Sequence, residues 1–330
     1  ESGPSGFEQP IRTLISKEIK EYVDEVRIDK FGNLIAHKKG KKPAVIIVAH
    51  MDEIGLLIKA ISEEGHIYTA SVGGIEPMTL LGERVQLKTK KGTIKGIITT
   101  KEIHNGDDIK KIPALRDVYV DTGLNRLALT KLGVGIGDYI HIMQHSTFLG
   151  NEKIICGKAL DDRLGCYILL ELAKRLQKNV CDLSYVFTVQ EEVGLYGAKT
   201  SVYSMDPDWA LVIDTTNADD YNQERYTKQI GRGPCITVKD SEMIGNKCLN
   251  DIFKELSKKT KIPIQLEITD FGTTDALSIS VAKGGIPTGM VSVPVRNIHT
   301  ASGIAHLDDI NNAVKLIEIL LRNPPKTCVT

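Results

Sequence analysis

The sequence VFTVQEEVGLYGA, residues 186–198, places two adjacent glutamates directly after an apolar run. The run from Leu183 to Val189 carries no charge and is rich in β-branched residues, which predicts a buried strand. Glu191 and Glu192 would lie at the end of this strand, where their like charges repel each other. If the pair is partly buried, its charge must be compensated, and a metal ion is the simplest candidate. Most adjacent glutamates are solvated, so the other apolar runs decide whether this pair is special.

Other histidines and carboxylates occupy equivalent places in the chain. His50, with Asp52 two residues later, follows the apolar run 44–49, and Asp214 follows the run 210–213. His299 comes after the run 288–293, and Asp161 opens a segment with helical spacing of leucine and isoleucine. Ligands of α/β proteins bind outside the carboxyl ends of parallel strands. We therefore expect these side chains to meet at one edge of a sheet.

Strand and helix patterns alternate through most of the chain, which predicts an α/β fold with a mostly parallel sheet and helices on both faces. Residues 60–148 differ, because short alternating segments separated by glycine-containing turns predict a small, mostly β domain. The expected division is a discontinuous larger domain, residues 1–59 and 149–330, interrupted by an inserted domain, residues 60–148. Helices are expected over 7–23, 124–132, 161–176, 246–259 and 309–321, and a hairpin over 26–37.

Composition limits the classes of partner. The 330 residues are 42% apolar and 25% charged with no net charge, so nothing indicates a nucleic acid or a membrane surface as partner. No apolar run is long enough to span a bilayer, and the first residues lack a secretory signal pattern. The six cysteines are scattered without a CxxC pair, so we expect reduced thiols in a cytoplasmic protein. The remaining histidines are expected to be surface or structural residues: His37, His66, His104, His141, His145 and His306.

Two imidazoles with several carboxylates suit zinc, cobalt or manganese, and the absence of cysteine argues against a closed structural zinc site. The set is too large for one ion, whereas two ions bridged by one carboxylate would use it. Asp52 is close enough to His50 to accept its second ring N–H. One glutamate of the 191–192 pair could bind metal while the other serves as general base.

The motifs AHMDEIG, GKALDDRLG, QEEVGLYGA, GTTDA, the Asp after ALVI and the IH of RNIHT together resemble the tetrahedral (TET) aminopeptidases. The resemblance implies a cytosolic exopeptidase with two divalent metal ions, either zinc or cobalt, with manganese as a third candidate. The resemblance covers nearly the whole chain. It implies that the inserted domain is a β-barrel used for dimerisation, that twelve-subunit tetrahedra are common, and that short peptides with a free N-terminus are the substrates.

The resemblance also assigns roles to residues. It implies Glu191 as general base and Asp52 as the carboxylate behind His50, with a supporting Asp162 joined to Asp161 by a cis peptide. The implied metal ligands, with Asp161 bridging, are His50, Asp161, Glu192, Asp214 and His299.

Two departures from the family motifs leave open which N-terminal side chain of the substrate is preferred. The usual glycine pair before Thr-Asp-Ala is Gly272-Thr273 here, and Thr300 to Gly303 replace the common Ser-Pro-Val-Glu type.

Two other functions remain as alternatives to an aminopeptidase. One is a carbohydrate hydrolase, although neighbouring glutamates flank a glycosidic bond poorly. The other is a non-catalytic assembly protein. The native metal also stays open.

Overall fold

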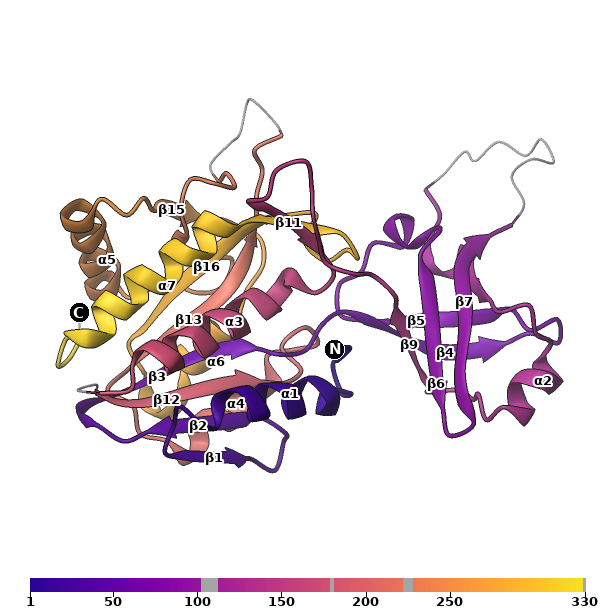
Figure 1. Cartoon of the computed structure of the whole chain (residues 1–330), viewed down its shortest axis with the longest axis horizontal. Coiled ribbons are helices and arrows are strands. Elements are labelled where there is room, and N and C mark those ends of the chain that lie inside the picture. The colour runs from indigo at the N-terminus through magenta and orange to yellow at the C-terminus, as the bar shows by residue number, and fades with distance from the viewer. Residues whose placement is uncertain (102–111, 179–180, 222–227, 329–330) are drawn as a thin grey trace.

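The computed structural model describes residues 1–101, 112–178, 181–221 and 228–328 (Figure 1). A larger α/β body contains both ends of the chain, and a smaller β-barrel lies beside it as a separate lobe. The predicted fold class is confirmed. His104, which we expected to be a surface or structural residue, lies outside the described residues.

The N-terminal elements follow the sequence pattern closely. Helix α1 (Gln9–Ile19) buries Ile11, Ile15 and Ile19 on one face, and this spacing is why the segment is helical. The predicted hairpin is formed by β1 (Glu25–Ile28) and β2 (Leu34–Lys38). Asp29 closes its turn by accepting hydrogen bonds from the backbone N–H groups of residues 31–33.

The described residues form an eleven-stranded sheet in the larger body. Its centre is parallel and consists of β12 (Cys181–Thr188), β3 (Lys41–His50), β13 (Trp209–Asn217) and β16 (Thr288–Arg296). Antiparallel pairings flank this centre and involve β1, β2, β17 (Gly303–His306), β11 (Ile154–Gly157), β10 (Thr147–Phe148) and β14 (Cys235–Lys239), and β15 (Gln265–Ile268) adds a parallel edge to β14. The sheet is therefore mixed, with a parallel core.

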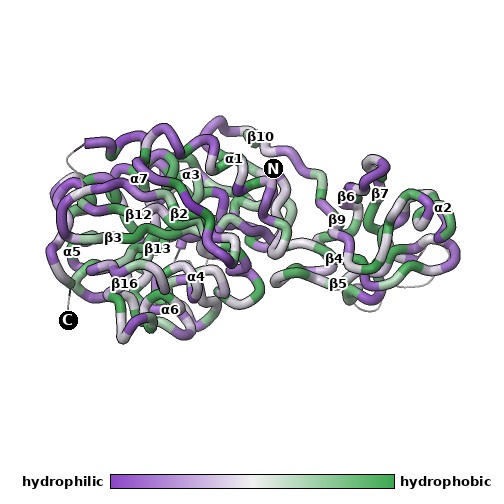
Figure 2. The backbone as a smooth tube through the Cα atoms, turned by 90° about the horizontal axis from the view of Figure 1, so that it is seen from below, coloured by the Kyte–Doolittle hydropathy of each residue, from purple (hydrophilic) through white to green (hydrophobic). Residues whose placement is uncertain are grey.

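Helices cover both faces of this sheet. One core packs α1, α3 (Leu160–Arg175), α5 (Lys247–Thr260) and α7 (Leu307–Arg322) against it. The other face holds α4 (Tyr196–Ser201) and α6 (Asp275–Ser280). Hydrophobic colouring follows the strands inside both lobes, and hydrophilic segments lie at the periphery (Figure 2). Among the described helices, none has both the length and the apolar character needed to cross a bilayer.

The smaller lobe is a closed antiparallel barrel with its own hydrophobic core. Its members are β4 (Gly55–Ile61), β5 (Ile67–Val72), β6 (Arg84–Thr89), β7 (Gly92–Thr100), β8 (Val118–Asp121) and β9 (Tyr139–Ile142), with the short helix α2 (Arg126–Lys131). Its first strand begins five residues before the expected boundary at residue 60. Thr147–Phe148 pairs instead with β11 of the larger sheet. The division at residues 60 and 148 stays a proposal.

Two expectations need correction. Cys248 and Cys328 form a disulfide, so the expectation of six reduced thiols is wrong; the described free cysteines are Cys156, Cys166, Cys181 and Cys235. The two residues are 80 positions apart in sequence, and only the packing of the C-terminal tail against α5 brings their Cα atoms to 5.5 Å. Asp214 lies inside β13 and not after it, because β13 pairs with β16 as far as Asn217.

Candidate metal centre

The elements around the parallel centre bring the predicted ligands together. His50 is the last residue of β3, and Asp214 lies in the adjacent strand β13. Glu191 and Glu192 follow β12, and His299 follows β16. Asp161 lies in the first turn of α3, where it and Asp162 have non-helical backbone angles and are joined by a cis peptide.

Asp161 lies between the two histidines. Its Oδ1 is 3.2 Å from Nε2 of His50, and its Oδ2 is 3.2 Å from Nε2 of His299. Asp214 Oδ1 completes the first group at 3.7 Å from Nε2 of His50. Glu192 Oε2 completes the second at 3.4 Å from Nε2 of His299. Within each of these groups of three, one ligand atom per residue lies within 4.8 Å of the others, which is compact enough to surround one ion.

Asp52 lies behind the first group and is fully buried. Its Oδ1 is 3.5 Å from Nδ1 of His50, on the side of the ring away from Asp161. The backbone N–H groups of Glu191 and Glu192 donate to its two oxygens at 3.1 and 3.3 Å. Nδ1 of His50 also lies 3.2 Å from the backbone carbonyl oxygen of Asp52. Asp52 therefore orients His50 through its carbonyl and its carboxylate, and the carboxylate also holds the loop that carries the two glutamates.

Electrostatics supports a cation at this place. Burial, followed by the charge of Asp161, raises the pKa of Glu192 to about 8. Burial also raises the pKa of Asp214 and of Glu191 well above their usual values. The bond to Asp161 raises the pKa of His299 to about 9. So many carboxylates in a buried place are costly unless positive charge is supplied.

An unpartnered atom points the same way. Glu192 Oε1 is buried, and no described residue gives it a hydrogen bond. The imidazole and carboxylate donor set suits zinc, cobalt or manganese, and the Nε2 atoms of both histidines face carboxylate oxygens. The residues present therefore fit two divalent ions that share Asp161.

Comparisons with known proteins show the family to which this chain belongs. Residues 32–316 match the model of the M42 glutamyl aminopeptidase family. The chain belongs to this family. It is 33% identical over 326 residues to a lysyl aminopeptidase of Pyrococcus furiosus, covering 97% of this chain and 93% of the relative.

Solved structures share the fold over almost the whole M42 chain. An aminopeptidase from the archaeon Desulfurococcus kamchatkensis superimposes with a TM-score of 0.93 at 35% identity, covering 99% of this chain and 92% of that one. The TET1 peptidase of Pyrococcus horikoshii gives a TM-score of 0.88 at 33% identity, with 97% and 96% covered. The resemblance to the TET aminopeptidases is confirmed.

Two residues of this M42 chain were missed as parts of the site. Asp275, noted only within GTTDA, is buried and accepts a 2.5 Å hydrogen bond from Thr188 Oγ1. Burial raises its pKa to about 6, and its charge in turn raises the pKa of Glu191. Ser5 donates a hydrogen bond to Asp52, and no pattern in the sequence distinguished it from other serines.

A cavity of about 610 Å³ opens beside the two ligand groups. The ligand side chains form part of its wall, and Met290 and Phe271 add apolar surface. Two buried side chains of the wall pair with each other, with Lys228 Nζ 2.7 Å from Glu267 Oε1. The cavity is large enough to hold an amino-acid side chain next to the metal centre.

Proposed function

We propose that this M42 aminopeptidase binds two divalent ions and removes the N-terminal residue of short peptides. The observation that carries the proposal is the position of Asp161, whose two oxygens lie 3.2 Å from two histidines on opposite sides. His50 and Asp214 would hold one ion, and Glu192 and His299 the other, with Asp161 shared. Zinc, cobalt or manganese suits these ligands. When bound, such a pair lowers the pKa of water and polarises a carbonyl group.

Glu191 is the proposed general base. Its side chain is half-buried at the cavity wall, next to the proposed ligand Glu192. Its backbone N–H is fixed by Asp52, so the carboxylate is held in place by its own loop. In the proposed reaction Glu191 takes a proton from the water that attacks the first peptide carbonyl. It then gives this proton to the leaving amine, which balances the hydrolysis.

The carboxylate oxygens of the site support the proposed preference for a free amino terminus. A free α-amino group would donate several hydrogen bonds to such oxygens, whereas an acetylated nitrogen has a single N–H and carries a bulky group. The side chain of the first residue would occupy the cavity of about 610 Å³.

We further propose that the barrel mediates dimerisation and that dimers assemble into a dodecamer. The Pyrococcus horikoshii TET1 peptidase is described as able to assemble into a tetrahedron or a large octahedral shell. Closed shells of this kind need a second contact surface on each dimer. In such a shell, unfolded peptides would enter and folded proteins would be excluded.

Metal depletion followed by reconstitution tests the enzymatic proposal. Chelated enzyme should lose activity on aminoacyl chromogenic substrates, and zinc, cobalt or manganese should restore it. The same peptides acetylated at the N-terminus should not be cleaved. Hydrolysis of glucans but not peptides would support a carbohydrate hydrolase instead, and metal-free protein with full peptidase activity would contradict the two-metal site.

Light scattering during size exclusion tests the assembly. A particle far larger than the 36.3 kDa chain is expected. A monomer would contradict the proposed shell without affecting the chemistry.

A further inference from the structure

We propose that Ser5 is a positioning residue for Asp52, which lies behind the candidate metal centre. The inference rests on the proposed function of that centre. Ser5 Oγ donates a 2.6 Å hydrogen bond to Asp52 Oδ2. Both residues are buried, with 4% and 0% of their surfaces exposed. Hydrogen bonds to a buried carboxylate are among the stronger ones, because the acceptor is charged.

The contribution of Ser5 follows from the other partners of Asp52. Oδ1 accepts from the backbone N–H of Glu191 and faces His50, whereas Oδ2 accepts from Ser5 and, at 3.3 Å, from the backbone N–H of Glu192. The Ser5 bond is the shorter of the two bonds to Oδ2. Without it, the longer bond from Glu192 would be the one bond that described residues give to this oxygen, and the carboxylate could rotate. His50 and the glutamate loop would then lose a common support.

Ser5 is itself held from two sides. Its backbone N–H donates to the carbonyl of Glu53 at 3.2 Å, which ties it to the loop after β3. Its carbonyl accepts a 2.8 Å hydrogen bond from Tyr139 Oη, in strand β9 of the barrel. The same residue therefore contacts the barrel through its backbone and Asp52 through its side chain.

The neighbours of Ser5 strengthen the contact with the barrel. The ring of Phe7 lies 5.3 Å from that of Tyr139, and Ser2 Oγ lies 2.7 Å from Nδ1 of His141 in the same strand. Gly6 has φ of +87°, and a Cβ there would be 2.5 Å from Tyr139 Oη. Only glycine allows this close approach without a shift.

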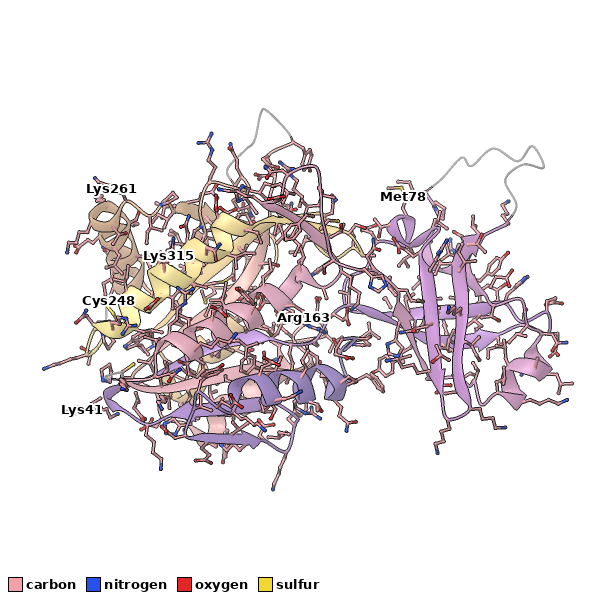
Figure 3. All side chains as sticks on the ribbon, in the orientation of Figure 1. Lys41, Met78, Arg163, Cys248, Lys261 and Lys315 are labelled. Atoms are coloured by element: carbon pink, nitrogen blue, oxygen red, sulfur yellow. A yellow bond between two sulfur atoms is a disulfide. The ribbon has the colours of Figure 1, made fainter. Side chains whose placement is uncertain are left out.

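Charged side chains hold the other end of the segment. Glu53 is buried, accepts a 2.7 Å hydrogen bond from the backbone N–H of Gly3, and pairs with Lys158. Arg163 bonds the carbonyls of Glu1 and Met51 at 2.9 and 3.0 Å. Figure 3 places Arg163 on the side of the larger body that faces the barrel. The segment is thus fixed along its length, and Ser5 is held in a defined position beside Asp52.

Three single variants test the positioning role. Ser5→Ala removes the donor, Ser5→Cys keeps a similar volume with a weaker donor, and Ser2→Ala removes a hydrogen bond of the same segment that does not reach Asp52. Asp52 is the partner behind the proposed ligand His50, and loss of such a partner typically costs 10- to 100-fold in metal affinity or activity. Ser5 supports Asp52 and not the ligand itself, so we expect Ser5→Ala to lower kcat and zinc affinity by about three- to tenfold, with KM within about twofold.

Ser5→Cys should fall between Ser5→Ala and the parent, and Ser2→Ala should match the parent. Zinc affinity is measured by competition with a chromogenic chelator, and kcat is normalised to the folded fraction. If Ser5→Ala retains parental kcat and zinc affinity, or Ser5→Cys retains both, the positioning role of the hydroxyl is wrong. Equal losses in Ser2→Ala would show a general effect of the segment and would also overturn it.

A structural readout separates this inference from the proposed function. Crystal structures of metal-free Ser5→Ala and Ser2→Ala should show the Asp52 carboxylate rotated in the first variant and unchanged in the second. This comparison needs neither metal nor substrate. An inactive parent would contradict the proposed function, whereas an unmoved Asp52 in Ser5→Ala would contradict the positioning role.

Discussion

Asp161 Oδ2 lies 3.2 Å from His299 Nε2, and the His299 side chain is 39% exposed. His50, on the other side of Asp161, has a side chain that is only 2% exposed. The two halves of the centre are therefore unequal in access to solvent, although they share one carboxylate. An ion held by Glu192 and His299 would exchange with solvent more readily than one held by His50 and Asp214.

We therefore predict that a chelator removes the two ions in separate kinetic phases. His299→Ala should abolish the fast phase and leave about one ion per chain. His50→Ala should weaken the binding of both ions, because the His50 ring is buried against Asp161 and Asp214. Elemental analysis during dialysis measures both outcomes. Loss of both ions from the parent at a single rate would contradict the prediction that the two ions differ in their access to solvent.

The two adjacent glutamates should respond differently to the same substitution. Glu191→Gln should keep the metal content and lower kcat by roughly 10² to 10⁴, the usual effect of removing a general base. Glu192→Gln should weaken metal binding, because Glu192 Oε2 lies 3.4 Å from His299 Nε2 in the second ligand group. Metal analysis and single-substrate kinetics on both variants check this. The opposite pattern would exchange the two roles.

The Cys248–Cys328 disulfide should stabilise the larger body, because it ties the C-terminal tail to α5 across 80 residues of sequence. We predict that Cys328→Ser lowers the free energy of unfolding by about 2 to 4 kcal/mol, the usual range for such a cross-link. Reductant should destabilise the parent and leave the variant unchanged.

Cys156→Ser is the matched control, since Cys156 is a partly exposed free thiol. Chemical denaturation with and without reductant provides the measurement. Titration of six free thiols in the native, non-reduced protein would show that the disulfide does not form.

His141 should make stability depend on pH. It is 3% exposed, and burial, followed by the charge of Lys88, lowers its pKa to about 4 from an ordinary 6.5. Between about pH 4 and pH 6.5, His141 is therefore mostly protonated in the unfolded chain and mostly neutral in the folded chain. The stability that the protein gains from keeping His141 neutral is fully present above about pH 6.5. This part of the free energy of unfolding is lost as the pH falls toward about 4.

The corresponding loss at pH 5 is up to about 2 kcal/mol relative to pH 7. His141→Gln removes the titration and should reduce the pH dependence by that amount. Urea unfolding of parent and variant at both pH values measures the difference. If the free energy of unfolding of the variant changes between the two pH values as much as that of the parent, His141 does not titrate in this way.

The sequence by itself determined most of the architecture. Isoleucines of α1 at helical spacing and the uncharged runs of β3 and β12 predict those elements, because amphipathic or fully apolar periodicity reflects burial. Placing His50, Glu192 and His299 after such runs also predicted that they would meet. This succeeds because the carboxyl ends of the parallel strands β3, β12 and β16 lie at one edge of the sheet.

Only the tertiary structure decided the contacts between distant polar groups. Ser5 and Asp52 meet because the first residues pass between barrel and sheet, and nothing local in SGPSG encodes that path. The sequence gives no sign that Cys248 and Cys328 pair, because they come together only through the packing of the C-terminal tail on α5. Hydrophobic periodicity reports which face of an element is buried, whereas a hydrogen bond or a disulfide depends on distances set by the packing of the whole chain.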